Sequence, residues 1–163
     1  IRYRSMEKGL IQVYSGEGHG KSAAALGRAV QMASMGRDVV IINFLKSYQN
    51  EAFLKRMEPE IKIFRFEKSE EEFAQLSDKH KQEEIYNIKN GLNFAKKVLT
   101  TGECGLLILD EVLGLIDKGI ITIEDLKHIL EARSEDVDII LTGIRLNEEV
   151  RRLADEIFKI EVV

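Results

Sequence analysis

The sequence predicts an α/β fold, with a mostly parallel sheet of about six strands and helices on both faces. Short apolar runs of strand length alternate with segments of helical periodicity along the whole chain. Glycine or polar residues follow directly after several of these runs, as expected where parallel strands end at a ligand-binding edge. Because the chain has 163 residues and contains no repeat or linker, we expect one domain over residues 1–163.

The expected strands are short apolar segments bounded by glycine, polar residues or the single proline. They cover residues 10–14, 39–44, 61–66, 106–109, 137–141 and 157–162. The expected helices between them have helical spacing of apolar residues, polar caps or terminal glycines. They cover 21–35 before Gly36, a short segment at 51–57, 77–100 ending near Gly102, 123–132 capped by Thr122, and 148–154 capped by Asn147.

A glycine-rich loop, S-G-E-G-H-G-K-S, joins the first expected strand to the first expected helix. Its three alternating glycines let successive backbone N–H groups turn toward one centre. Lys21 then offers a positive charge to a phosphate, and Ser22 a hydroxyl to Mg²⁺, at a helix N-terminus. A turn that only caps the helix is the alternative. We predict a nucleoside-triphosphate site formed by Ser15, Gly16, Glu17, Gly18, His19, Gly20, Lys21, Ser22 and Ala23.

A second group of candidate residues follows the apolar run at 105–109, which ends in Asp110 and Glu111. An acid at the carboxyl end of a buried parallel strand is suited to bind a phosphate-bound Mg²⁺. Asp110 could instead cap a following helix. With the glycine-rich loop upstream we favour the magnesium site, formed by Ser22 and Asp110. Phe44 with Lys46, and Thr142 with Gly143, end other strands at the same expected edge.

Composition excludes several other classes of protein. The net charge of −4, with basic residues scattered along the chain, predicts no nucleic-acid partner. No apolar run is long enough to cross a bilayer, so we expect no membrane partner. The sequence has one cysteine, Cys104, which excludes an internal disulfide framework. Without a signal peptide, the cytoplasm is the expected compartment.

With these motifs in hand, the chain resembles the P-loop corrinoid adenosyltransferases, the ATP:cob(I)alamin enzymes that make adenosylcobalamin. The resemblance covers most of the chain in order, and the loop with Ser15 at its start is its most specific part. The similar segments are 9–27, Asn43-Phe44-Leu45-Lys46, Leu109-Asp110-Glu111, Glu131-Ala132-Arg133, Leu141-Thr142-Gly143 and Leu153-Ala154-Asp155.

The resemblance implies a RecA-like fold, a homodimer, and a reaction in which a reduced Co(I) corrinoid attacks the 5′ carbon of ATP and releases triphosphate. The corrinoid would be cobalamin or cobyrinic acid diamide, with ATP as cosubstrate and Mg²⁺ as cofactor. By this resemblance Lys21 and Glu111 are the catalytic residues: Lys21 holds the polyphosphate, and Glu111 helps hold the metal. An acid at position 111 also suits ATP hydrolysis, where it orients water.

The chain also departs from the family pattern. His19 replaces a lysine in the loop, Gln31 stands in place of an arginine that contacts the polyphosphate, and a G-F-T-W-like segment is absent between Phe64 and Ser77. The chain also lacks the usual C-terminal tail. We therefore expect a divergent member with slow adenosyl transfer. The alternative is a diverged P-loop ATPase or nucleotide-dependent switch without corrinoid activity. A small-molecule kinase is disfavoured, because no arginine-rich lid segment is seen.

Overall fold

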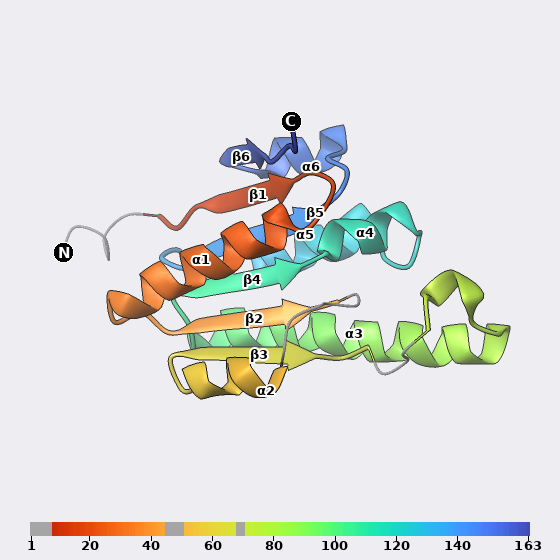
Figure 1. Cartoon of the computed structure of the whole chain (residues 1–163), viewed down its shortest axis with the longest axis horizontal. Helices are drawn as coiled ribbons and strands as arrows, with labels where there is room; N and C mark the ends of the chain where they lie inside the picture. Colours follow the sequence, from red (N-terminus) through yellow and green to blue (C-terminus); the bar gives the residue numbers. More distant parts are fainter. Residues whose placement is uncertain (1–7, 45–50, 68–70) are drawn as a thin grey trace.

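The computed structural model describes residues 8–44, 51–67 and 71–163, which form a six-stranded sheet with helices on both faces (Figure 1). All strand pairs are parallel, in the order β3-β2-β4-β5-β1-β6. The strands are β1 (Ile11–Ser15), β2 (Val39–Asn43), β3 (Ile61–Arg65), β4 (Leu106–Asp110), β5 (Asp138–Gly143) and β6 (Glu156–Lys159). The predicted fold class is confirmed.

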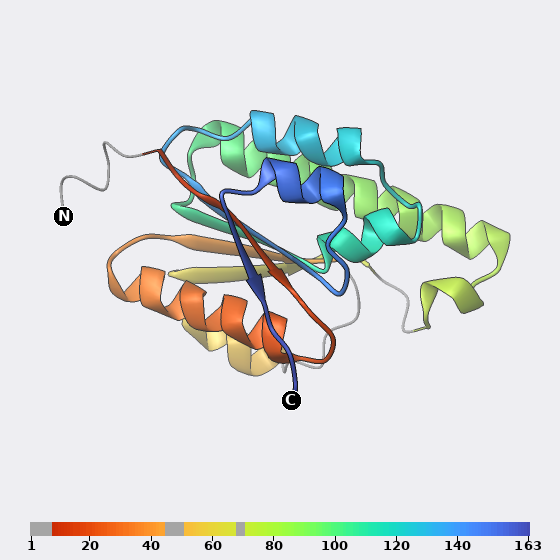
Figure 2. The same ribbon diagram turned by 90° about the horizontal axis from the view of Figure 1, so that it is seen from above.

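The helices divide between the two faces of the sheet. Figure 2 shows α1 and α2 on one face and the other helices on the opposite face. Their bounds are α1 (Gly20–Ser34), α2 (Glu51–Leu54), α3 (Asp78–Thr101), α4 (Val112–Asp117), α5 (Ile123–Glu131) and α6 (Glu148–Leu153), with 3-10 turns at Lys55–Met57 and Phe73–Gln75. Within the described ranges, no helix has the length and hydrophobicity needed to cross a membrane.

The four inner strands are buried along their whole length, which explains why their sequences are mainly apolar. One core lies under α1, where Ala25, Ala29 and Met32 pack on the sheet. The larger core lies on the opposite face, under α3 to α6. Small side chains on α1 let that helix approach the sheet closely, so its first turn lies next to the strand ends.

Local signals in the sequence set the helix ends as predicted. The Thr122 hydroxyl accepts a hydrogen bond from the Asp125 amide at 3.1 Å, and the Asp125 carboxylate accepts one from the Thr122 amide at 2.9 Å. The Asn147 side chain accepts a hydrogen bond from Val150 at the start of α6. Gly102, with φ of 69°, ends α3 in the left-handed conformation that glycine adopts without strain.

Some segments differ from the predictions. The strand expected at 157–162 is β6, which spans Glu156–Lys159 and ends three residues earlier. The short helix expected at 51–57 is an α-helical turn followed by a 3-10 turn. Helix α4 was not predicted at all, because five of its six residues are apolar or glycine and only Asp117 is charged. Val112, Leu113 and Leu115 are all buried in the larger core. Packing against the end of β5 therefore determines this helix, and a local amphipathic pattern does not.

We predict that Gly143→Ala destabilises the protein, because an added Cβ would overlap the side chain of Leu113 in α4. Overpacking of this kind costs about 1–3 kcal/mol of unfolding free energy. Gly27→Ala is the matched control: Gly27 is exposed in the interior of α1, where a Cβ meets no atom within 4 Å. It should stabilise the protein by up to about 1 kcal/mol. Urea unfolding measures both, and equal stabilities would contradict the prediction.

Candidate active site

The candidate site lies at the carboxyl edge of the sheet, where β1, β5 and β4 end side by side (Figure 1). Ser15 of β1 is in register with Gly143 of β5, and Asp110 of β4 is in register with Asn43 of β2. The glycine-rich loop runs from the end of β1 to α1, which begins at Gly20. Parallel topology thus brings the loop and the acidic pair, nearly ninety residues apart in sequence, to one edge.

Two glycines in the loop adopt backbone conformations that other residues rarely take. Gly16 has φ of 146°, and its N–H donates to the Gly143 carbonyl at 3.2 Å. A Cβ at Gly16 would overlap the carbonyl oxygen of Ile160, which follows β6. Gly18 has φ of 81° and open space around it. Gly16 is therefore required by close backbone packing as well as by its φ angle.

Lys21 is 4% exposed and folds back over the loop. Its ammonium donates to the Gly18 carbonyl at 2.9 Å and lies 2.8 Å from Oε1 of Glu111. The structure thus brings together Lys21 and Glu111, the two residues predicted to be catalytic. A phosphate that binds Lys21 must compete with this carboxylate for the same charge.

Ser22 and Asp110 form the second contact between the loop and β4. The Ser22 hydroxyl donates to Oδ1 of Asp110 at 2.9 Å, which leaves the lone pairs of the hydroxyl oxygen available to a cation. The capping alternative for Asp110 is wrong. Glu111 occupies the N-cap position of α4, with φ of 64° and no side-chain capping bond, while Asp110 belongs to β4.

Sequence reasoning placed Thr142 at a strand end but gave it no role. In the structure it is fully buried, and its hydroxyl lies 2.7 Å from Oδ1 of Asp110 and 2.7 Å from the amide nitrogen of Glu111. A polar residue near the end of an otherwise apolar strand was the available signal. Its partners are the last residue of β4 and the residue after it, and the contact depends on the strand order, which cannot be read from the sequence.

Comparison with known proteins identifies the family. A family profile described as "ATP:corrinoid adenosyltransferase BtuR/CobO/CobP" matches residues 7–163. The chain belongs to this family.

Curated relatives agree with the family profile. The corrinoid adenosyltransferase of Escherichia coli K12 is 24% identical over 160 residues, covering 96% of this chain and 79% of the relative. The corrinoid adenosyltransferase of Pseudomonas aeruginosa is 25% identical over 160 residues, covering 96% of this chain and 77% of the relative. The resemblance predicted from the loop and the acidic pair is confirmed at the level of the family.

Solved structures support the fold. The KaiC-like protein PH0186 from Pyrococcus horikoshii matches with a TM-score of 0.63 and 16% identity, covering 96% of this chain and 74% of that one. The flagellar accessory protein FlaH from Methanocaldococcus jannaschii matches with a TM-score of 0.60 and 16% identity, covering 94% of this chain and 71% of that one. The adenosyltransferase family member described here therefore has the RecA-like P-loop fold that the sequence predicted.

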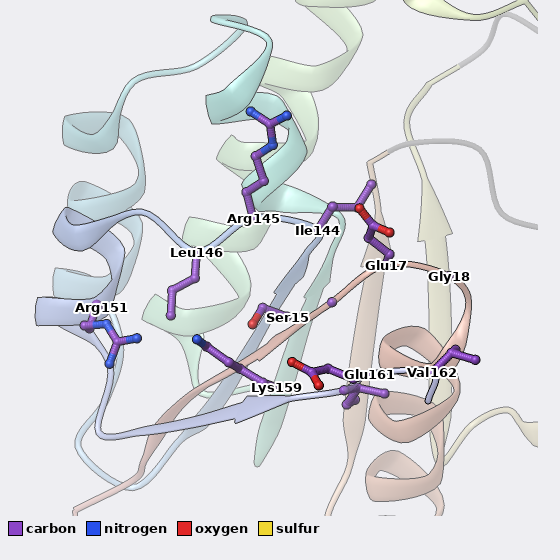
Figure 3. A pocket seen from close by; sticks show the side chains of 12 residues that line it. Ser15, Glu17, Gly18, Ile144, Arg145, Leu146, Arg151, Lys159, Glu161 and Val162 are labelled. Carbon is purple, nitrogen blue, oxygen red and sulfur yellow. The ribbon is translucent and has the colours of Figure 1, made fainter.

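A cavity of about 730 Å³ adjoins the loop on its β6 side (Figure 3). The backbone of residues 15–18 forms one wall, and Leu146 supplies an apolar surface. Arg145, Arg151 and Lys159 also line it; Figure 3 shows Lys159 extending toward Ser15 and Leu146, whereas Arg145 extends away from the loop. Sequence reasoning missed these cations, although Arg145 lies only two residues after the Thr142-Gly143 strand end.

Other predicted residues lie at the rim of the site or outside it. Glu17, His19 and Ala23 are exposed on the loop and the first turn of α1. Gln31 is exposed ten residues beyond Lys21, which is about 15 Å of helix rise, so in this chain it does not line the loop. Lys46 lies outside the described residues.

The one cysteine takes no part in this chemistry. Cys104 is buried just before β4, and burial raises the pKa of its thiol to about 12. A thiol with that pKa stays protonated at neutral pH and is a poor nucleophile. Among the described residues, no group of three or more histidine, cysteine, aspartate and glutamate side chains could hold a metal ion. A cation at this edge would need hydroxyl and ligand oxygens as well.

We predict that Glu111→Gln raises the affinity for metal-free ATP, because the substitution frees Lys21 from its ion pair and removes a negative charge near the phosphates. The gain should be about threefold to tenfold, the size of one charge-assisted hydrogen bond or less. Glu17→Gln is the matched control, since it removes the same charge from an exposed position in the same loop. Calorimetry in EDTA measures both; an unchanged or weaker affinity for Glu111→Gln would contradict the prediction.

Proposed function

We propose that this protein transfers the 5′-adenosyl group of Mg-ATP to a reduced Co(I) corrinoid and releases triphosphate. The observation that carries the proposal is a pair of contacts between the loop and the acidic residues at the end of β4, in a member of this family. Lys21 contacts Glu111, and Ser22 contacts Asp110. We also propose that residues 1–163 act as one domain of a cytoplasmic homodimer, without nucleic-acid or membrane partners.

In this proposal the polyphosphate binds at the N-terminus of α1. The loop amides from Ser15 to Ala23 and the helix dipole attract the negative charge, and Lys21 adds a fixed cation. Lys21 already lies within 3 Å of the Gly18 carbonyl, so the ammonium is held beside the loop before any ligand arrives. Binding then exchanges Glu111 for a phosphate oxygen at Lys21, with little movement of the lysine.

The residues present fit Mg²⁺. Ser22 and Asp110 offer hard oxygen ligands, and the magnesium ion usually takes its other ligands from phosphate and water. Glu111, once released from Lys21, is a third oxygen donor near the same place. When bound, the ion would neutralise charge on the leaving triphosphate. The protein's part is to hold these oxygens at the edge of the sheet.

The proposed chemistry needs no general base. The electron pair of Co(I) forms the bond to the 5′ carbon, and the bond from that carbon to the triphosphate oxygen breaks, so the triphosphate leaves with its electron pair. Catalysis then consists of positioning and of stabilising the leaving group. The cavity beside residues 15–18 supports binding of a ligand larger than the triphosphate alone.

A second candidate function is ATP hydrolysis or a nucleotide-dependent switch. The position of Glu111 favours it, because a carboxylate next to Lys21 could orient a water molecule toward the terminal phosphate. The two reactions give different products. Adenosyl transfer releases triphosphate, whereas hydrolysis releases ADP and phosphate.

The proposed function predicts that the protein, incubated with ATP, Mg²⁺ and chemically reduced cobalamin, forms a cobalt–carbon bond. Visible spectroscopy follows the adenosylated corrinoid, and anion-exchange chromatography quantifies triphosphate. We expect the two products in equal amounts, and no triphosphate when the corrinoid is left out. ADP and phosphate without corrinoid product would contradict adenosyl transfer and favour the second candidate.

We predict that Lys21→Ala weakens ATP binding by about tenfold to a hundredfold, since a charge-assisted contact is worth about 1.5–3 kcal/mol. The sheet should remain folded, because the apolar contacts of α1 come from Ala25, Ala29 and Met32. Lys127→Ala, which removes a partly exposed lysine from α5, is the control and should bind ATP normally. Calorimetry and circular dichroism measure binding and folding; unchanged affinity would remove Lys21 from the nucleotide site.

A further inference from the structure

Thr142 is a fully buried polar residue in the middle of the sheet. It is the penultimate residue of β5, the strand that lies between β1 and β4. Its relative exposure is 0%, so it cannot contact a ligand bound at the edge of the sheet without rearrangement. A buried hydroxyl requires hydrogen-bond partners, and the identity of those partners indicates what this one does.

The two hydrogen bonds of Thr142 fix the direction of its proton. The Asp110 carboxylate can only accept, so the Thr142 hydroxyl donates to Oδ1 at 2.7 Å. The Glu111 amide can only donate, so its bond of 2.7 Å ends on the hydroxyl oxygen. One side chain of β5 thus holds both acidic residues that follow the apolar run of β4.

The bond to Asp110 orients a carboxylate that also meets the loop. Oδ1 of Asp110 accepts from Thr142 and from the Ser22 hydroxyl, 2.9 Å away. Rotation of the carboxylate would break both bonds at once. Thr142 and Ser22 therefore fix the plane in which the second oxygen of Asp110 is presented.

The bond to Glu111 supports a backbone conformation that is unfavourable for a residue with a Cβ. Glu111 has φ of 64° and ψ of 20°, in the left-handed region. This conformation turns the chain from β4 directly into α4, and from it the Glu111 carboxylate reaches Lys21 at 2.8 Å. The Thr142 hydroxyl is the partner that the Glu111 amide has in this turn.

We propose that Thr142 is a positioning residue that holds Asp110 and Glu111 ready for Mg²⁺ and the Mg²⁺-bound phosphates. The inference rests on the proposed function, because it presumes that Mg-ATP binds at this edge. In this proposal Thr142, near the end of β5, keeps Asp110 of β4 in contact with the glycine-rich loop. Thr142 acts through its two partners and touches neither the metal nor the nucleotide.

The test compares Thr142→Val with Thr142→Ser by measuring ATP affinity in Mg²⁺ and in EDTA. Valine has nearly the shape of threonine but no hydroxyl, whereas serine keeps the hydroxyl. We expect Thr142→Val to lose about tenfold or more in Mg-ATP affinity and about twofold or less without metal, the former matching one hydrogen bond to a charged group. Thr142→Ser should restore Mg-ATP affinity to within about threefold of the unchanged protein.

The matched control is Thr100→Val, which removes an exposed threonine hydroxyl that donates to the Lys96 carbonyl in α3. It should leave both affinities unchanged. A Thr142→Val variant added to Asp110→Asn should cause little further loss of Mg-ATP affinity, because the two substitutions disturb one contact. If Thr142→Val gives no folded protein, Thr142→Cys replaces it, since a thiol is a weak donor of similar size.

Equal losses in Mg²⁺ and in EDTA would overturn the inference and leave Thr142 with a structural role. A Thr142→Ser variant that binds Mg-ATP as weakly as Thr142→Val would also overturn the inference. So would a valine or cysteine variant that binds Mg-ATP as tightly as the unchanged protein. The outcome is distinct from that of the adenosyl-transfer assay. If the protein forms corrinoid product and Thr142→Val keeps its Mg-ATP affinity, only this inference is refuted. If Mg-ATP binding depends on Thr142 but no corrinoid product forms, only the proposed reaction is refuted.

Discussion

The buried carboxylate of Asp110 is the interaction on which the arrangement of this site depends. It accepts hydrogen bonds from Ser22 at the start of α1 and from Thr142 at the end of β5, while its own backbone belongs to β4. Three elements that are far apart in the sequence therefore meet on one oxygen atom. Because the parallel register already aligns the strand ends, this polar contact requires little additional ordering of the chain.

The same edge stores a local cost that the surrounding fold must offset. A left-handed residue with a Cβ costs roughly 1–2 kcal/mol, and Glu111 is such a residue. The conformation persists because α4 follows at once with three buried apolar side chains, and because Gly143 leaves room for Leu113. The result is a carboxylate held against Lys21, so that the two charges neutralise each other.

Most of the fold could be predicted from the sequence, because the buried strands and the caps are local signals. The run at 105–109 and the caps at Thr122 and Asn147 each act within a few residues. Helix α4 could not be predicted, since five of its six residues are apolar or glycine and show no amphipathic pattern. At the site, the loop and the acidic pair could be identified by motif. The hydrogen bonds of Thr142 and the cavity beside β6 depend on the strand order. Because the sequence does not reveal the strand order, neither feature could be predicted.

The pairing of Lys21 with Glu111 also bears on which chemistry suits this edge. A carboxylate that serves as a general base in hydrolysis must stay near the terminal phosphate and hold a water molecule after the nucleotide binds. A carboxylate that only balances the charge of Lys21 can move to the metal once a phosphate takes its place. Adenosyl transfer requires only a carboxylate that can move to the metal, because its nucleophile is the cobalt of the corrinoid and no water must be activated. The decisive property of Glu111 is therefore where its carboxylate lies when ATP is bound, and its presence in the sequence suits both reactions equally.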